Sequence, residues 1–306
     1  MDKFNEYLIL KGYSAASVKT IIRSTEYFLK WCEADNISDI AAVSHNDVVA
    51  YVKTCNARGT GRKTVAHYIM HLKKYFDFLQ EEGEVNDNPC SNIKIKGIKR
   101  KVLYEILSTE ELEQLYKNYS TEIKPDEEVK YMPPQQLNEL SRKRNKIITG
   151  LLVYQGLRSE EVRRLEVADL KLREGKIFIA GSRRTNERTL KLESHQVFDL
   201  LDYINDTRKQ LLNLTQQQTQ QLFISKGNSS NYSNLMSYLN KQLHQLNNKV
   251  KDLKQIRTSV ITHWLKLYNL RKVQIMAGHR YVSSTESYQA NNLEDLKEDI
   301  KNYHPF

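Results

Sequence analysis

Residues 176–192, KIFIAGSRRTNERTLKL, contain the clearest strand pattern in the chain. They decide the fold class that we predict for its C-terminal half. Residues suited to strands run through 176–180, and a second such segment follows at 188–192. The polar, basic segment 181–186 joins the two as a turn. The stretch therefore predicts one small antiparallel sheet.

Helices are predicted on both sides of this hairpin. Ser108 and Glu111 stand at capping-box spacing, which indicates the start of a helix. The polar segment 121–134 contains three prolines and is expected to form a loop. Further helices are expected over 135–155, 194–213, 230–246 and 252–268. The C-terminal half is therefore predicted to be mostly helical around the small sheet.

A separate all-helical domain is predicted for residues 1–95. Ser14 and Ser44 stand where N-cap residues are expected, ahead of apolar residues at helical spacing. Thr60 or Gly61 opens a further helix of the same kind. These start signals predict a small domain of about four helices.

A basic linker, residues 96–107, is expected to join this domain to a second domain at 108–306. The surrounding segment 94–101, KIKGIKRK, contains five basic residues in eight. Such a run is either a solubilising linker or a segment that lies along a phosphate backbone. Both interpretations remain open at this point.

The composition favours a polyanionic partner and excludes several classes of protein. The 306 residues include 47 Lys and Arg against 37 Asp and Glu, which gives a net charge of +10. The mean hydropathy is −0.63, and no apolar run suits a membrane span. Three cysteines without metal-ligand spacing indicate a reducing cytoplasm and argue against a disulfide framework or a zinc site.

Four short motifs follow one another in the C-terminal half. They are Gly-Leu-Arg-Ser-Glu-Glu with Arg158 and Glu161, the hairpin turn with Arg183, Lys-Gln-Ile-Arg with Lys254 and Arg257, and Gly-His with His279. Tyr288 follows nine residues after the histidine. Each residue alone has an ordinary structural explanation, and Tyr288 is one of 18 tyrosines. The order and spacing of all these residues together favour a catalytic role over the ordinary structural explanations.

In these residues the chain resembles the tyrosine recombinases of the phage integrase family. The family signature is Arg, Lys, His-x-x-Arg, Gly-His and Tyr, and the catalytic part of the match covers about residues 108–290. The resemblance implies a mainly α fold of the α+β type. A helical, SAM-like core-binding domain would precede a mostly helical catalytic domain with a small antiparallel sheet.

The resemblance also implies a reaction. Tyr288 would attack a DNA phosphodiester to form a 3′-phosphotyrosyl intermediate, and strand exchange and religation would need no ATP, metal or other cofactor. Arg158 and Arg257 would stabilise charge on the phosphate, with Glu161 supporting Arg158. His279, or the group at Lys254, would donate a hydrogen bond or act as a base.

Two positions depart from the family pattern. Lys254 stands where the first histidine is usual, and lysine favours charge stabilisation over proton abstraction unless its pKa is lowered. Arg183 stands where the hairpin lysine is expected to protonate the leaving oxygen. An arginine is a poor proton donor, although it still stabilises an oxyanion.

The implied partner is double-stranded DNA carrying specific recombination sites. The resemblance implies a homotetramer on two DNA sites, no membrane association, and a cytoplasmic, nucleoid-associated location. Residues 291–303 are expected to form a tail helix that docks either on a neighbouring subunit or in cis. Two rival functions are a catalytically silent DNA-binding protein of the same fold and a type IB topoisomerase.

Basic residues outside the catalytic motifs are expected to meet DNA phosphates, with a merely solvated surface as the alternative. In the N-terminal domain and the linker they are Arg62, Lys63, Lys73, Lys74, Lys96, Lys99, Arg100 and Lys101.

Overall fold

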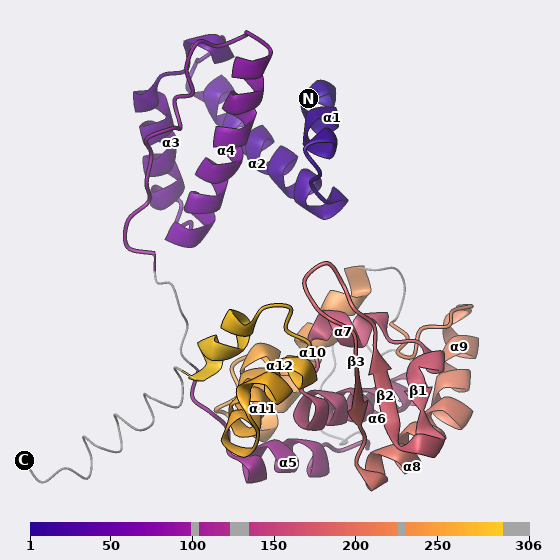
Figure 1. Ribbon diagram of the computed structural model, residues 1–306. Helices are drawn as coiled ribbons and strands as arrows, with labels where there is room; N and C mark the ends of the chain where they lie inside the picture. Colours follow the sequence, from indigo (N-terminus) through magenta and orange to yellow (C-terminus); the bar gives the residue numbers. More distant parts are fainter. Residues whose placement is uncertain (99–103, 123–134, 226–229, 290–306) are drawn as a thin grey trace, which may run out of the picture. The chain divides into compact units, whose positions relative to one another are not determined.

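The computed structural model describes residues 1–98, 104–122, 135–225 and 230–289 (Figure 1). The chain divides into two compact units, Met1–Val102 and Leu103–Phe306. The loop expected at 121–134 lies mostly outside the described residues, and the expected tail helix lies wholly outside them.

The N-terminal unit is built from helices. In chain order they are α1 (Asp2–Leu10), α2 (Ala15–Ala34), the short 3₁₀ helix η1 (Ile40–Ala42), α3 (His45–Ala57) and α4 (Arg62–Glu81). The start signals are confirmed: Ser14 caps α2, Ser44 forms a capping box with Asp47 at α3, and Gly61 is the N-cap of α4. Local capping therefore sets where these helices begin.

An aromatic core holds this unit together. Phe28 of α2 packs edge-on against Tyr51 of α3 and Phe76 of α4, and Phe4 of α1 packs against Tyr75 of α4. The three cysteines are buried and unpaired, as expected for small apolar residues. Burial of these side chains is the main force that joins the four long helices.

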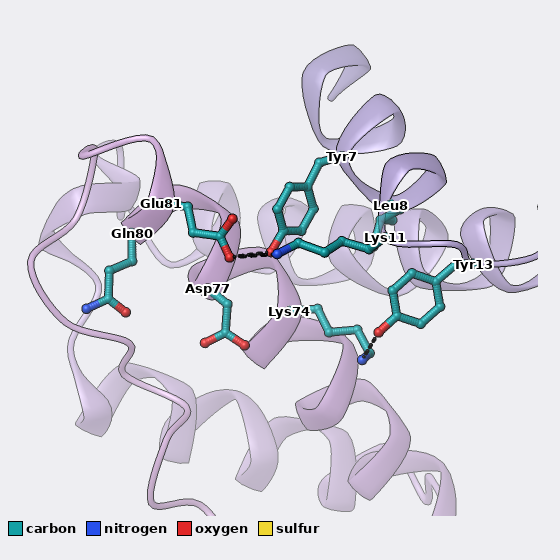
Figure 2. Close-up of a pocket in the computed structure, with 8 residues that line it drawn as sticks. All are labelled: Tyr7, Leu8, Lys11, Tyr13, Lys74, Asp77, Gln80 and Glu81. Atoms are coloured by element: carbon teal, nitrogen blue, oxygen red, sulfur yellow. Dashed lines mark hydrogen bonds and ion pairs between the residues drawn. The ribbon is translucent and has the colours of Figure 1, made fainter.

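A cleft of about 440 Å³ lies between α1 and the C-terminal half of α4 (Figure 2). At one end, the hydroxyl of Tyr7 and the ammonium of Lys11 both donate to Glu81, at 2.8 and 3.1 Å. At the other end, Lys74 donates to the hydroxyl of Tyr13 at 2.6 Å. Polar bonds at the rim thus fix α1 and the following turn against α4.

The C-terminal unit surrounds a small sheet with helices (Figure 1). The segments before the sheet are α5 (Thr109–Lys117), α6 (Gln135–Gln155), α7 (Ser159–Arg164) and η2 (Val167–Asp169). Those after it are α8 (Ser194–Asp202), the π-helical η4 (Tyr203–Thr207), α9 (Arg208–Thr215), α10 (Ser230–Leu246), α11 (Leu253–Leu267) and α12 (Leu270–Ala277). Residues 282–289 form a further helical segment.

The sheet has the order β1-β2-β3 and is antiparallel throughout. Its strands are β1 (Leu170–Lys171), β2 (Lys176–Ile179) and β3 (Arg188–Lys191), with η3 (Leu172–Glu174) between the first two. The predicted hairpin is confirmed, with Ile177 opposite Leu190 and Ile179 opposite Arg188. β1 escaped prediction because two residues carry no recognisable period.

The fold class predicted from the sequence is confirmed. The hydrophobic core of the C-terminal unit packs α6 against α5, α9 and α11, and the fully buried Leu151 and Leu152 of α6 belong to it. The expected helix over 194–213 is a run of α8, η4 and α9 with a π-helical segment inside it. Within the described residues, no helix combines the length and apolar character needed to span a membrane.

Candidate active site

Glu161 lies at the centre of the candidate site. Arg158 is the N-cap of α7, and its amide donates to Oε2 of Glu161 at 2.9 Å. The Arg158 guanidinium donates to Oε1 of the same carboxylate at 3.2 Å, yet 34% of its side chain stays exposed. The three-residue spacing of these two residues thus places a buried carboxylate beneath a partly exposed arginine.

Arg188, the first residue of β3, forms a bidentate pair with this carboxylate. Its two Nη atoms lie 3.0 and 2.9 Å from the Glu161 oxygens, and each side chain is only 1% exposed. Arg257 of α11 approaches the carboxylate to 3.8 Å. Three guanidiniums therefore share one buried carboxylate.

The arginines determine the ionisation of Glu161. Burial raises the pKa of its carboxyl, but the hydrogen bonds and charge of Arg188, with the charge of Arg257, outweigh burial and lower the pKa to about 2. Glu161 is therefore ionised at neutral pH. A buried carboxylate of this kind is stable only when its charge is paired and its acceptor positions are filled by hydrogen-bond donors.

Arg257 is held by backbone carbonyl groups. Its guanidinium donates to the carbonyl oxygens of Gly156 and Ala277, the latter at 2.7 Å. Burial, with the neighbouring Arg158, lowers the pKa of Arg257 to about 10, so the side chain is still charged at neutral pH. Gly156 takes φ +57°, and a Cβ there would lie 3.1 Å from Val260 on the same helix as Arg257. Glycine therefore allows this close approach.

His279 is neutral and has a defined tautomer. Arg257 has only donors, so Nε2 of His279, 3.2 Å away, must accept, and Nδ1–H donates to Thr285 at 2.9 Å. Burial and the charges of Arg257 and Arg158 lower the pKa of His279 to about 3. Both ring nitrogens are thus engaged, and the imidazole adds no charge to the site.

Tyr288 lies on this histidine. The two rings stack with centroids 5.5 Å apart and an interplanar angle of 17°. Tyr288 is half-buried, and it also packs on the apolar cluster of Ile261, Val273 and Ala277. His279 therefore positions the phenol ring, which lies near enough to Arg257 to oppose in part the lowering of the pKa of that guanidinium.

The hairpin turn is bound to the turn that carries His279. The amide of Asn186 donates to the carbonyl of Gly278 at 3.2 Å, and Thr185 pairs with His279 as an antiparallel bridge. Arg280 donates to the carbonyl of Arg183 at 2.9 Å, and Arg164 of α7 donates to the carbonyl of Gly181 at the base of the turn at 3.2 Å. Hairpin, α7 and the His279 turn thus form one assembly.

Comparison with known proteins places this geometry in a family. The model described as "Phage integrase family" matches residues 105–295, and that described as "Phage integrase, N-terminal SAM-like domain" matches residues 1–83. The chain belongs to the phage integrase family. It is a tyrosine recombinase by that membership.

Curated relatives of this integrase-family chain match it along its length. It is 26% identical over 315 residues to tyrosine recombinase XerC of Oceanobacillus iheyensis, covering 100% of this chain and 95% of that protein. It is 25% identical over 310 residues to tyrosine recombinase XerD of Listeria innocua, covering 100% and 98%.

Solved structures share the fold. A lambda integrase tetramer bound to a Holliday junction gives a TM-score of 0.63 at 12% identity, covering 94% of this chain and 75% of that chain. The Tn1549 transposon integrase in complex with circular intermediate DNA gives 0.64 at 14% identity, covering 93% of each. At such identities the likeness shows the fold alone.

Five residues singled out by the integrase-family resemblance come together in the structure. They are Arg158, Glu161, Arg257, His279 and Tyr288. Two others do not join them through any contact among the described residues: Lys254 is exposed in the first turn of α11, and the side chain of Arg183 is exposed at the hairpin tip. Only the backbone of Arg183 is bound to the His279 turn.

Sequence reasoning missed Arg188 and Thr285. Arg188 occupies a buried position in a strand whose burial alternates, so a charged residue on the inner face was the available signal. Thr285 is fully buried, and only its place between the Gly-His motif and Tyr288 marks it in the sequence. Neither sequence signal predicts which side chain Arg188 or Thr285 contacts.

The predicted DNA-contacting residues take different positions. Arg62, Lys63 and Lys73 are exposed on α4, and Lys96 is exposed after it. Lys74 is half-buried and bonded to Tyr13, so it also fixes the α1–α4 cleft. Lys99, Arg100 and Lys101 lie outside the described residues. Within the described ranges, no group of three or more His, Cys, Asp or Glu has metal-binding geometry.

Proposed function

We propose that this recombinase cuts and rejoins duplex DNA at specific sites through a covalent bond between Tyr288 and a 3′-phosphate. The observation that carries the proposal is the buried charge beside the phenol. Three guanidiniums less one carboxylate leave two positive charges, and His279 is neutral. A phosphodiester carries one negative charge, and its pentacoordinate transition state carries two.

The reaction conserves the energy of the phosphodiester. The Tyr288 oxygen forms a bond to phosphorus, the bond from phosphorus to the 5′ oxygen breaks, and the phenolic proton leaves to solvent or a nearby base. The 5′ oxygen takes up a proton and departs as a hydroxyl. Attack by a 5′-hydroxyl of the exchanged strand reverses these steps, so religation needs no ATP.

The site residues divide this work. Arg158 is the partly exposed guanidinium and would fork onto the non-bridging oxygens. Arg257 would supply charge from a position fixed by two carbonyls, and Glu161 holds both arginines in place. Removal of one such electrostatic contact typically costs about 10²–10³-fold in rate.

His279 would keep the Tyr288 ring in line and, after rearrangement around the phosphate, donate or accept a hydrogen bond. Lys254, one turn before Arg257, would add charge near the phosphate. Arg183 would stabilise the leaving oxyanion from the hairpin tip. The proton for the 5′ oxygen then comes from solvent or Lys254, since arginine holds its proton too tightly.

Double-stranded DNA is the proposed partner. The exposed basic residues of α4 and the linker would bind backbone phosphates and give a steep salt dependence. A homotetramer on two sites is part of the proposal, supported by the fold shared with an integrase solved as a tetramer on a Holliday junction. Arg62, Lys63, Lys73, Lys74, Lys96, Lys99, Arg100 and Lys101 are the proposed phosphate contacts.

A nicked DNA substrate tests the proposal, because loss of the short strand after cleavage traps the covalent intermediate. We expect a protein–DNA adduct with the wild type in the presence of EDTA, and none with Tyr288→Phe. Tyr281→Phe is the matched control, since Tyr281 is exposed just before the helical segment 282–289 and its hydroxyl has no partner among the described residues.

The rival functions give different results. A catalytically silent DNA-binding protein would bind its site tightly and form no adduct. A type IB topoisomerase would relax supercoiled plasmid lacking paired sites, whereas a recombinase requires two sites in one assembly. An adduct that persists in Tyr288→Phe would overturn the assignment of the nucleophile.

A further inference from the structure

The buried guanidinium of Arg188 was counted above only for its charge, yet it makes two hydrogen bonds to Glu161. Its two bonds occupy one acceptor position on each carboxylate oxygen. The Arg158 amide and guanidinium take the other two, at 2.9 and 3.2 Å. A carboxylate accepts about four such bonds, so Glu161 is saturated.

We propose that Arg188 is a positioning residue that saturates Glu161 and thereby leaves the guanidinium of Arg158 available to the phosphate. The inference rests on the proposed function of the site. Arg158 spends one side-chain hydrogen bond on Glu161 and keeps about a third of its side chain exposed. Arg188 does the opposite, since it is buried and spends both Nη atoms on the carboxylate.

Removal of Arg188 would redirect Arg158. Two buried acceptor positions on Glu161 would lose their donors, and a buried carboxylate without donors is strongly unfavourable. Arg257 is anchored on the carbonyls of Gly156 and Ala277, so Arg158 is the guanidinium free to turn inward. A bidentate pair with Glu161 would then withdraw it from the face where the phosphate binds.

The net charge of the site would change as well. With Arg188, three guanidiniums and one carboxylate leave two positive charges. Without Arg188, one positive charge remains at the site. That charge cannot balance the two negative charges of the pentacoordinate transition state. Arg188 therefore contributes to catalysis without touching the phosphate.

The fold makes room for this guanidinium at Gly278. The residue has φ +64°, and a Cβ there would lie 2.9 Å from Cζ of Arg188 and 3.1 Å from the carbonyl of Asn186. Only a glycine fits both the backbone conformation and the close approach. The glycine of the Gly-His motif thus makes room for the Arg188 guanidinium, and His279 is the next residue of the same turn.

The test compares Arg188→Met with Glu161→Gln/Arg188→Met in the nicked-substrate assay at saturating protein. We expect Arg188→Met to lower the rate of adduct formation about 10²-fold, as for a misplaced catalytic group. DNA affinity should be unchanged. In the double variant the neutral amide no longer attracts Arg158 and the charge of the site returns to two, so the rate should recover at least tenfold.

Arg173→Met is the matched control, because Arg173 is an exposed arginine of η3 beside the same sheet. We expect it to cleave at the wild-type rate. A role in packing alone predicts that the double variant is as slow as Arg188→Met, and that result would overturn the proposal. Wild-type rates for Arg188→Met would overturn it too.

A second variant distinguishes a loss of folding from a loss of cleavage. Where Arg188→Met does not fold, Arg188→Lys replaces it, since a lysine keeps the charge but cannot form the fork. We expect Arg188→Lys to fall between the wild type and the inactive protein, and a wild-type rate would contradict the inference. Absence of an adduct with the wild type would instead refute the proposed function.

Discussion

Two carboxylates, Glu81 in the N-terminal unit and Glu161 in the C-terminal unit, have similar partners in opposite surroundings. Glu81 accepts from Tyr7 and Lys11 at the rim of the α1–α4 cleft, and its side chain is 54% exposed (Figure 2). Glu161 accepts from Arg158 and Arg188 and is 1% exposed. Of these two carboxylates, only Glu161 carries its charge in surroundings from which water is excluded.

The difference in burial changes how strongly the partners of each carboxylate act on its pKa. Hydrogen bonds from Tyr7 and Lys11 lower the pKa of Glu81, but water screens the charges and competes for them. Around Glu161, the arginines lower the pKa to about 2 against the effect of burial. Low local polarity strengthens each interaction there and makes each unpaired charge costly.

The largest expected effect comes from removing the buried carboxylate. Glu161→Ala leaves the buried Arg188 and Arg257 without an anion and should lower the free energy of unfolding of the C-terminal unit by about 3–5 kcal/mol. Urea unfolding followed by Trp264 fluorescence, in a Trp31→Phe background, measures this unit alone. The exposed Glu187 supplies the control, and a comparable loss in Glu187→Ala would contradict the comparison.

Acid should weaken the same cluster. The pKa of Glu161 is about 2 in the folded chain against an ordinary 4.5, so its contribution is complete above 4.5 and is lost as pH falls toward 2. That difference corresponds to about 3 kcal/mol. Glu161→Gln should flatten this part of the stability profile. An unchanged acid slope in the variant would assign it to other carboxylates.

His279 should affect the pH dependence of stability at higher pH than Glu161 does. Its pKa falls from 6.5 to about 3 on folding, so only the unfolded chain takes up a proton as pH falls below 6.5. The C-terminal unit should lose about 2 kcal/mol between pH 6.5 and about pH 5, and His279→Gln should remove this loss. His71, whose pKa burial also lowers, lies in the other unit, so Trp264 fluorescence excludes it.

The smallest effect is expected at the surface. Glu81→Gln should leave the midpoint of thermal unfolding of the N-terminal unit unchanged within error, because solvent replaces both donors. Trp31 fluorescence in a Trp264→Phe background reports on that unit. A loss comparable to that in Glu161→Ala would show that the cleft, and not burial alone, strengthens the pairing.

Local patterns predicted the helices well. Ser44 with Asp47 and Ser108 with Glu111 both form the expected capping boxes, because a cap joins groups only three residues apart. The hairpin was predictable from its two segments and turn. β1 was not, since it exists only because Leu170 finds Ile177 as a partner.

The candidate site also contains residues that the sequence predicted and contacts that only the tertiary structure revealed. The order of the motifs singled out Arg158, Glu161, Arg257, His279 and Tyr288, and the structure brings all five together. The partnership of Glu161 with Arg188 spans 27 positions and has no local signature. The same holds for the hydrogen bond from the amide of Asn186 to the carbonyl of Gly278, which joins segments far apart in the sequence.

From the sequence alone came the family, the order of the proposed site residues and the helical framework, since these depend on residue type and short spacing. Tertiary structure decided the charge of the site. It buries Arg188 with Glu161, neutralises His279 and leaves Arg158 partly exposed. The reason is that burial and pairing, which set the pKa and the energy of a charged group, arise only when distant segments pack together.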